Sequence, residues 1–191
     1  MSLPFSFLDQ RPIVIAIAGS NGAGKSTFFH TYLSDCGLRF VNADVIAGEL
    51  DISAYDAAEV AAAIRSSLVL HRESFVFETV LSDPIGDKVD TFAGYADLGY
   101  TVVLFFIRIN EVSQSIGRVA MRVARGGHDI PDEKLRSRFE RTKANLGRAI
   151  DRLPHVVVYD NSDLRQPYQL VEVYESGKRV TVPMKDREFE Q

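Results

Sequence analysis

The stretch AGSNGAGKST, residues 18–27, decides the fold, because it joins a buried strand to a helix through a glycine-rich loop. The preceding PIVIAIAG (12–19) is a continuous apolar run, which is typical of a strand buried on both faces of a parallel sheet. The following KSTFFHTYLSD (25–35) has the length of a helix. In this context the pattern G-x-x-x-x-G-K-[ST] predicts a phosphate-binding loop, and it is matched by Gly19, Gly24, Lys25 and Ser26.

The residues of this loop have distinct expected roles. Glycines allow a tight turn in which backbone N–H groups converge on phosphate oxygens, and the helix N-terminus adds a partial positive charge. We expect Lys25 to reach the β- and γ-phosphates and the Ser26 hydroxyl to ligate Mg²⁺. The alternative is a glycine-rich turn that carries a lysine by coincidence. The residues expected to bind the nucleotide are Gly19, Asn21, Gly22, Ala23, Gly24, Lys25, Ser26 and Thr27.

Strands and helices alternate along the rest of the chain. We expect strands over 12–19, 39–44, 74–79, 100–109 and 155–162, and helices over 25–35, 55–73, 83–99, 110–127 and 131–153. This alternation predicts an α/β fold of the P-loop NTPase type, with a doubly wound, parallel, five-stranded sheet. Two alternating runs around ESGK predict a C-terminal β-hairpin over about 168–183. No linker or repeat interrupts the sequence, so we expect a single domain over residues 1–191.

Composition limits the classes of partner. The 191 residues carry a formal net charge of −4, so the chain has no general attraction to nucleic acid or to an anionic membrane. No apolar stretch is long enough to span a membrane, and the N-terminus lacks the features of a signal peptide. The single cysteine, Cys36, excludes an intrachain disulfide. A cytoplasmic location is therefore expected.

Acidic residues lie at the carboxyl ends of three of the expected strands: Asp44, Glu78 and Asp160. Ligands bind at the carboxyl ends of the strands in doubly wound sheets. Asp44 could accept the proton of an acceptor hydroxyl and hold it in line with the γ-phosphorus, or it could instead cap the next helix. Glu78 could bind the acceptor or a Mg²⁺-bound water, and Thr79 could donate a hydrogen bond to the acceptor. A helix-capping turn is the alternative for both.

A basic series surrounds ARGGHDIPDE (124–133), and it comprises Arg118, Arg122, Arg125, Arg136, Arg138 and Arg141. The glycine pair predicts a lid over about 118–138 that could close over the phosphates and exclude water. Cations stacked on one helix face favour an anionic partner, and Arg122 is expected to contact the nucleotide. A solvated charged face is the alternative for part of the series. His128 is expected to contact the acceptor or to be structural.

Signatures of hydrolytic nucleotide enzymes are missing from the sequence. There is no LSGGQ-type motif and no NKxD motif, and the run VVLFFIRIN (102–110) does not end in the acidic pair of a hydrolytic site. The loop is therefore interpreted as one that transfers phosphate and excludes water.

Together, AGSNGAGKST, FVNADVIA, FETVLS, RVARGGHDIP and RFERT resemble the zeta-toxin-like kinases over roughly residues 13–162. The resemblance implies a core like that of nucleoside monophosphate kinases and an ATP-dependent phosphotransferase whose acceptor, in the better-known toxins, is a UDP-linked amino sugar. It implies Asp44 as catalytic base, Glu78 and Thr79 in the acceptor pocket, and Arg125 and Arg138 as phosphate-clamping arginines. YDNSD (159–163) resembles the segment that lines the adenine pocket, which includes Asn161.

The combined interpretation is a Mg·ATP-dependent kinase of a small hydroxyl-bearing acceptor, with Lys25, Asp44, Arg125 and Arg138 as its catalytic residues. Two alternatives stay open. One is a kinase of another acceptor, such as an antibiotic, a nucleoside or a polynucleotide end, although the acidic pI weighs against the last. The other is a nucleotide-binding regulator without an acceptor. An antitoxin partner is possible, but no segment that would bind one can be identified in the sequence.

Overall fold

A computed structural model describes residues 3–127 and 129–181 of the chain. Its centre is a seven-stranded sheet with the order β2-β3-β1-β4-β5-β6-β7. The first five strands in sequence are parallel, as predicted, and they are β1 (Ile13–Ala18), β2 (Arg39–Val41), β3 (Phe75–Thr79), β4 (Thr101–Arg108) and β5 (His155–Asp160).

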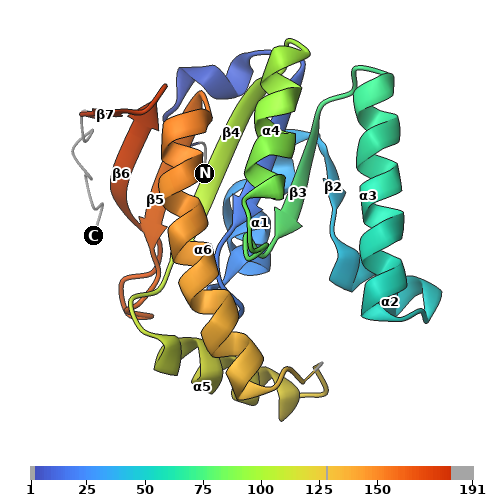
Figure 1. Ribbon diagram of the computed structural model, residues 1–191, viewed down its shortest axis with the longest axis vertical. Helices are drawn as coiled ribbons and strands as arrows, with labels where there is room; N and C mark the ends of the chain where they lie inside the picture. The colour runs from blue at the N-terminus through green and yellow to red at the C-terminus, as the bar shows by residue number, and fades with distance from the viewer. Residues whose placement is uncertain (1–2, 128, 182–191) are drawn as a thin grey trace.

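The predicted hairpin forms, but it is not a separate appendage. Its strands β6 (Gln169–Glu175) and β7 (Lys178–Val180) pair antiparallel, and β6 also pairs antiparallel with β5. The hairpin therefore extends the five-stranded sheet to seven strands along one edge (Figure 1). The last residues of the expected hairpin range, 182 and 183, lie outside the described residues.

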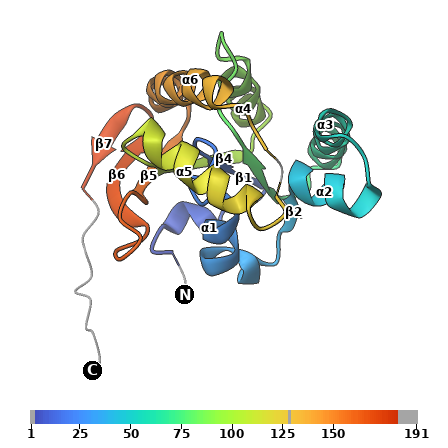
Figure 2. The ribbon, with the colours of Figure 1, turned by 90° about the horizontal axis from the view of Figure 1, so that it is seen from below.

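Alternate side chains of β1 face two different cores, which explains its uninterrupted apolar sequence. Val14, Ala16 and Ala18 pack on one face, under α3 (Ala54–Leu70), α4 (Asp87–Asp97) and α6 (Asp132–Arg152). Ile13 and Ile15 pack on the other face, with aromatic residues of α1 (Lys25–Tyr32) and of the N-terminal segment. Figure 2 shows α4 and α6 on one side of the sheet and α1 on the other.

The structure departs from the sequence expectation at the start of α4 and after β2. α4 begins at Asp87, after Gly86 in a left-handed conformation, so Pro84 precedes the helix and does not lie in its first turn. An additional short helix, α2 (Ala43–Leu50), follows β2, where the sequence was expected to continue as strand to residue 44. α2 and α5 (Val112–Val123) both lie at the end of the sheet where the parallel strands finish, so they flank the predicted phosphate loop (Figures 1 and 2).

Within the described ranges, no helix is both long and apolar enough to cross a membrane.

Candidate active site

The loop between β1 and α1 depends on glycine at defined positions. Gly19, Gly22 and Gly24 have φ angles of +148°, +74° and +96°, which disfavour residues with a side chain. A Cβ atom on Gly19 would fall on the carbonyl oxygen of Ile107, which belongs to the backbone and cannot turn aside. The loop therefore needs glycine both for its backbone angles and for its close approach to the end of β4.

Replacing Gly19 by Ala is expected to lower the free energy of unfolding by about 3 kcal/mol, because the new methyl group meets backbone at an unfavourable φ. Gly117→Ala is the matched control, since Gly117 lies within α5 and has open space around its Cβ position. The control should be neutral or stabilising by up to about 1 kcal/mol. Urea unfolding of both variants measures the difference, and equal stabilities would contradict the argument.

The carbonyl oxygens of five consecutive loop residues, 20–24, each accept a hydrogen bond from a side chain. The pairs are Lys25 Nζ to Ser20 (3.0 Å), Ser115 Oγ to Asn21 (2.7 Å), Arg118 Nη1 to Gly22 (3.4 Å), Asn161 Nδ2 to Ala23 (2.8 Å) and Tyr168 OH to Gly24 (2.9 Å). In a trans peptide, a carbonyl and the following N–H point in opposite directions. These five hydrogen bonds therefore orient the N–H groups of the loop away from the side-chain donors. One of these N–H groups, that of Ala23, donates to the carbonyl oxygen of Ser20 and closes a turn.

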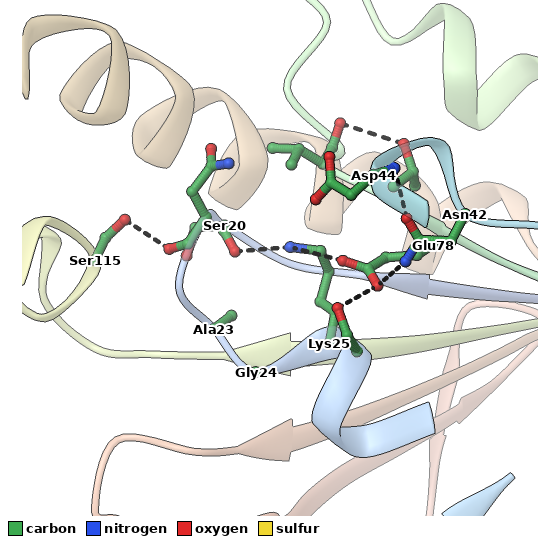
Figure 3. A network of polar contacts seen from close by, with 12 residues as sticks. Ser20, Ala23, Gly24, Lys25, Asn42, Asp44, Glu78 and Ser115 are labelled. Atoms are coloured by element: carbon green, nitrogen blue, oxygen red, sulfur yellow. Dashed lines mark hydrogen bonds and ion pairs between the residues drawn. The ribbon is translucent and has the colours of Figure 1, made fainter. Parts of the chain in front are cut away.

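Lys25 is buried at the start of α1, with 6% of its side chain exposed, and its Nζ lies 3.8 Å from Glu78 Oε1 (Figure 3). Burial lowers the pKa of Lys25. Glu78 and Asp44 act in the opposite direction, while Arg122 and Arg138 lower it further. The Lys25 ammonium is thus held out of water in a site where more than one arginine adds positive charge. Such a site favours a ligand that brings negative charge.

The Glu78 carboxylate joins the first turn of α1 to the start of α2. It accepts hydrogen bonds from Ser26 Oγ (2.7 Å) and from Asn42 Nδ2 (2.8 Å), and 12% of its side chain is exposed. Among the described residues, no group of three or more His, Cys, Asp or Glu side chains is arranged to hold a metal. The Ser26 hydroxyl and the Glu78 carboxylate do provide the oxygen ligands that Mg²⁺ takes when substrate phosphates and water complete its shell.

Asp44 lies in the first turn of α2, and the cap of this helix is Asn42. Asn42 Oδ1 accepts hydrogen bonds from the N–H groups of Asp44 (2.8 Å) and Val45 (3.4 Å). The alternative that Asp44 itself is the N-cap is therefore wrong. The Asp44 carboxylate is exposed, and Figure 3 places it on the same side of the loop as Lys25 and Glu78. A general base that takes the proton of an acceptor hydroxyl would need this position.

Thr79 ends β3 beside a lysine that the sequence analysis missed. Lys88 Nζ, from the first turn of α4, donates to Thr79 Oγ1 (3.1 Å) and to the carbonyl oxygen of Val80 (2.8 Å). Burial lowers the pKa of Lys88, and Arg65 and Arg138 lower it further, while Asp83 raises it. No sequence pattern marked Lys88, because its contact depends on α4 folding back along the end of β3.

The arginines of the basic series have different surroundings. Arg118 Nη2 donates to the carbonyl oxygens of Asn161 (2.8 Å) and Ser162 (3.1 Å), so Arg118 binds backbone where an anion was expected. Arg138 is half-buried, and burial lowers its pKa, as does Arg141. Arg122 and Arg125 are exposed near the end of α5. His128, the expected acceptor contact in the lid, lies outside the described residues.

An open hollow of about 800 Å³ lies beside the loop, between the end of α5 and the segment 161–168. This volume is in the range of a nucleotide-sized ligand site. Two apolar side chains that the sequence analysis missed, Met121 and Leu164, line it, and they are 60% and 66% exposed. Arg122, Arg125 and Thr27 also line it.

Asn161 lines the same hollow, but it is buried and its amide holds the loop. The expected contact of Asn161 with a nucleotide base stays a prediction.

The family model described as zeta toxin matches residues 50–170. The chain belongs to the zeta toxin family. The match includes Glu78, Arg125 and Arg138, whereas the phosphate loop and Asp44 precede the matched range. A search of curated proteins finds no significant match.

Solved structures show the same fold. AvrRxo1-ORF1:AvrRxo1-ORF2 with sulphate ions has a TM-score of 0.73 at 18% identity, covering 90% of this chain and 61% of that one. The PezAT toxin–antitoxin system of Streptococcus pneumoniae has a TM-score of 0.62 at 14% identity, covering 86% and 72%. A gluconokinase from Sinorhizobium meliloti has a TM-score of 0.51 at 22% identity, covering 81% and 86%. This zeta toxin family member therefore has a P-loop kinase fold, and it spans about three fifths of the length of the matched chain in the AvrRxo1 complex.

Proposed function

We propose that this zeta toxin family member transfers the γ-phosphoryl group of Mg·ATP to a hydroxyl group of a small acceptor. The observation that carries the proposal is the convergence of Lys25, Ser26 and Glu78 at the glycine loop, with the exposed carboxylate of Asp44 on the same side (Figure 3). Nucleotide binding alone would account for Lys25, Ser26 and a Mg²⁺-holding Glu78, but it gives no role to a second carboxylate, that of Asp44. The likeness to a structure of AvrRxo1-ORF1:-ORF2 with ATP supports ATP as the donor.

The nucleotide would lie across the loop, with its phosphates on residues 19–27 and its base in the hollow. Met121 and Leu164 offer apolar surface for a base, and Arg122 and Arg125 lie beside them to bind phosphate. The likeness of the fold to P-loop kinases supports this orientation. Mg²⁺ would be held by Ser26 Oγ and the Glu78 carboxylate, and when bound it would neutralise phosphate charge.

The transfer step would use Asp44 as general base. Its carboxylate takes the proton of the acceptor hydroxyl as that oxygen bonds to the γ-phosphorus, and the bond from the γ-phosphorus to the bridging oxygen breaks to release ADP. Lys25 and Arg138 stabilise the charge on the transferring group, because both lie where burial strengthens electrostatic interactions. Glu78 and Thr79 are proposed acceptor contacts, as is His128, which lies outside the described residues.

Two kinds of acceptor are proposed. A UDP-linked amino sugar is the first candidate, and an antibiotic, a nucleoside or a polynucleotide end is the alternative. Lys88, Arg65 and Arg138 place several cations near the end of β3, which favours an acceptor with negative charge. We propose a cytoplasmic activity, and a protein partner by analogy with the toxin–antitoxin system PezAT.

The test is transfer of labelled γ-phosphate from Mg·ATP, first to UDP-N-acetylglucosamine alone and then to a fractionated metabolite extract. Label on the UDP-sugar would support the first candidate. Label only on another fraction would keep the kinase and reassign its acceptor. ATP binding without transfer to any fraction would support a regulator and overturn the proposal.

A further inference from the structure

The C-terminal hairpin begins at a tyrosine that is fixed from several sides. Tyr168 immediately precedes β6, has a left-handed φ of +53° and is 7% exposed. Its ring packs edge-on against two rings of α1, with centroid distances of 5.4 Å to Phe28 and 5.6 Å to Tyr32. An aromatic side chain held in this way has little freedom to move its hydroxyl group.

The Tyr168 hydroxyl ends against the phosphate loop. It donates to the carbonyl oxygen of Gly24 (2.9 Å), the residue that caps α1 and directly precedes Lys25. Burial raises the pKa of Tyr168, so the hydroxyl stays protonated and able to donate at neutral pH. A Cβ atom on Gly24 would lie 2.8 Å from this hydroxyl oxygen, which shows how closely the loop and the tyrosine approach each other.

We propose that Tyr168 is a positioning residue for the phosphate loop, and that the hairpin thereby belongs to the kinase machinery. The Gly24 carbonyl accepts the Phe28 N–H of α1 (2.9 Å), and the Tyr168 hydroxyl is its second donor. The hydroxyl thereby adds to the hold on the Gly24–Lys25 peptide, whose Lys25 N–H points in the opposite direction, where a phosphate would lie. This inference rests on the proposed function. It adds a residue that lines the hollow and whose hydroxyl holds the backbone of the loop.

A second contact from the same segment supports this assignment. Asn161, just after β5, donates to the carbonyl oxygen of Ala23, so the segment 161–168 holds two neighbouring carbonyls of the loop. The same segment lines the hollow beside the loop. A nucleotide bound there would contact the segment that shapes its phosphate site.

The test compares Tyr168→Phe with Tyr100→Phe in the full chain. Tyr100 is a suitable control because it is 4% exposed and its hydroxyl also bonds backbone carbonyls, those of Leu68, Val69 and Glu73, far from the loop. Each variant loses one buried hydroxyl and keeps its ring. We expect Tyr168→Phe to weaken ATP binding about fivefold in calorimetry and to raise the KM for ATP similarly, with little change in kcat. Tyr100→Phe should change neither quantity.

A readout without nucleotide separates this inference from the proposed function. ¹⁵N relaxation of the free protein should show lower order parameters at the Gly24 and Lys25 amides in Tyr168→Phe, and unchanged values in Tyr100→Phe. Equal order parameters in both variants, or equal ATP affinity, would overturn the positioning role. If the unaltered protein bound no nucleotide, the proposed kinase would fail, while the order parameters would still decide whether Tyr168 shapes the loop.

Discussion

Replacing Asp44 by Asn is expected to reduce phosphoryl transfer by roughly 10²–10⁴-fold while ATP binding changes less than about twofold. The amide keeps the shape of the side chain but cannot accept the acceptor proton as a carboxylate does. Because Asn42 caps α2, the substitution leaves the helix start intact. The loss would therefore report chemistry and not folding. Single-turnover transfer and calorimetric ATP binding measure the two effects separately.

The matched control for this variant is Asp51→Asn. Asp51 is the C-terminal cap of the same helix, with a left-handed φ of +52° that asparagine also tolerates. The chemical change is the same, but it occurs at the far end of α2. The control should retain transfer and stability. Normal transfer in Asp44→Asn would show that Asp44 is not the base.

Replacing Lys25 by Met should have the second large effect, a loss of about 10²–10³-fold in transfer together with much weaker ATP binding. Lys25 is the buried ammonium at the loop. Burial lowers its pKa, which means that keeping the charged form at this position costs free energy. A cation in that position stabilises the phosphate charge more strongly than it would in water. Radiolabel transfer and nucleotide titration measure the two losses.

Stability measurements separate the loss of transfer in Lys25→Met from misfolding. Lys25→Met leaves Glu78 without the neighbouring ammonium, which can destabilise the fold, so the double variant Lys25→Met/Glu78→Gln is needed. It should recover stability without recovering transfer. Lys134→Met, at an exposed position of α6, should leave both unchanged. Transfer near the normal rate in Lys25→Met would refute the role of the loop lysine.

The parts of the fold that sequence predicted well are those where local patterns agree with the global arrangement. β1 is apolar without interruption because its two faces pack against different cores, and the loop glycines occur where the backbone needs them. These signals are local and therefore visible in sequence. The pairing of β6 with β5 is not local, so the hairpin could be predicted but its place at the edge of the sheet could not.

In the candidate site, too, contacts between residues distant in sequence could not be predicted. The position of Asn42 before a short apolar segment is a capping signal that could have revealed α2, although an eight-residue helix has a weak period. The spacing of Arg118 predicted the helix face it occupies but not its partner, which is backbone from a segment more than forty residues later. Lys88 and Tyr168 reach the site only through tertiary packing.

The five side-chain hydrogen bonds to the loop carbonyls also determine when a chain that is still being synthesised can bind ATP fully. Their donors are synthesised in the order Lys25, Ser115, Arg118, Asn161 and Tyr168, and the last of them follows Gly24 by 144 positions. Nascent chains that end before the hairpin contain every residue of the phosphate motif but lack its final support. During synthesis, full ATP binding should therefore emerge late, after most of the polypeptide has left the ribosome.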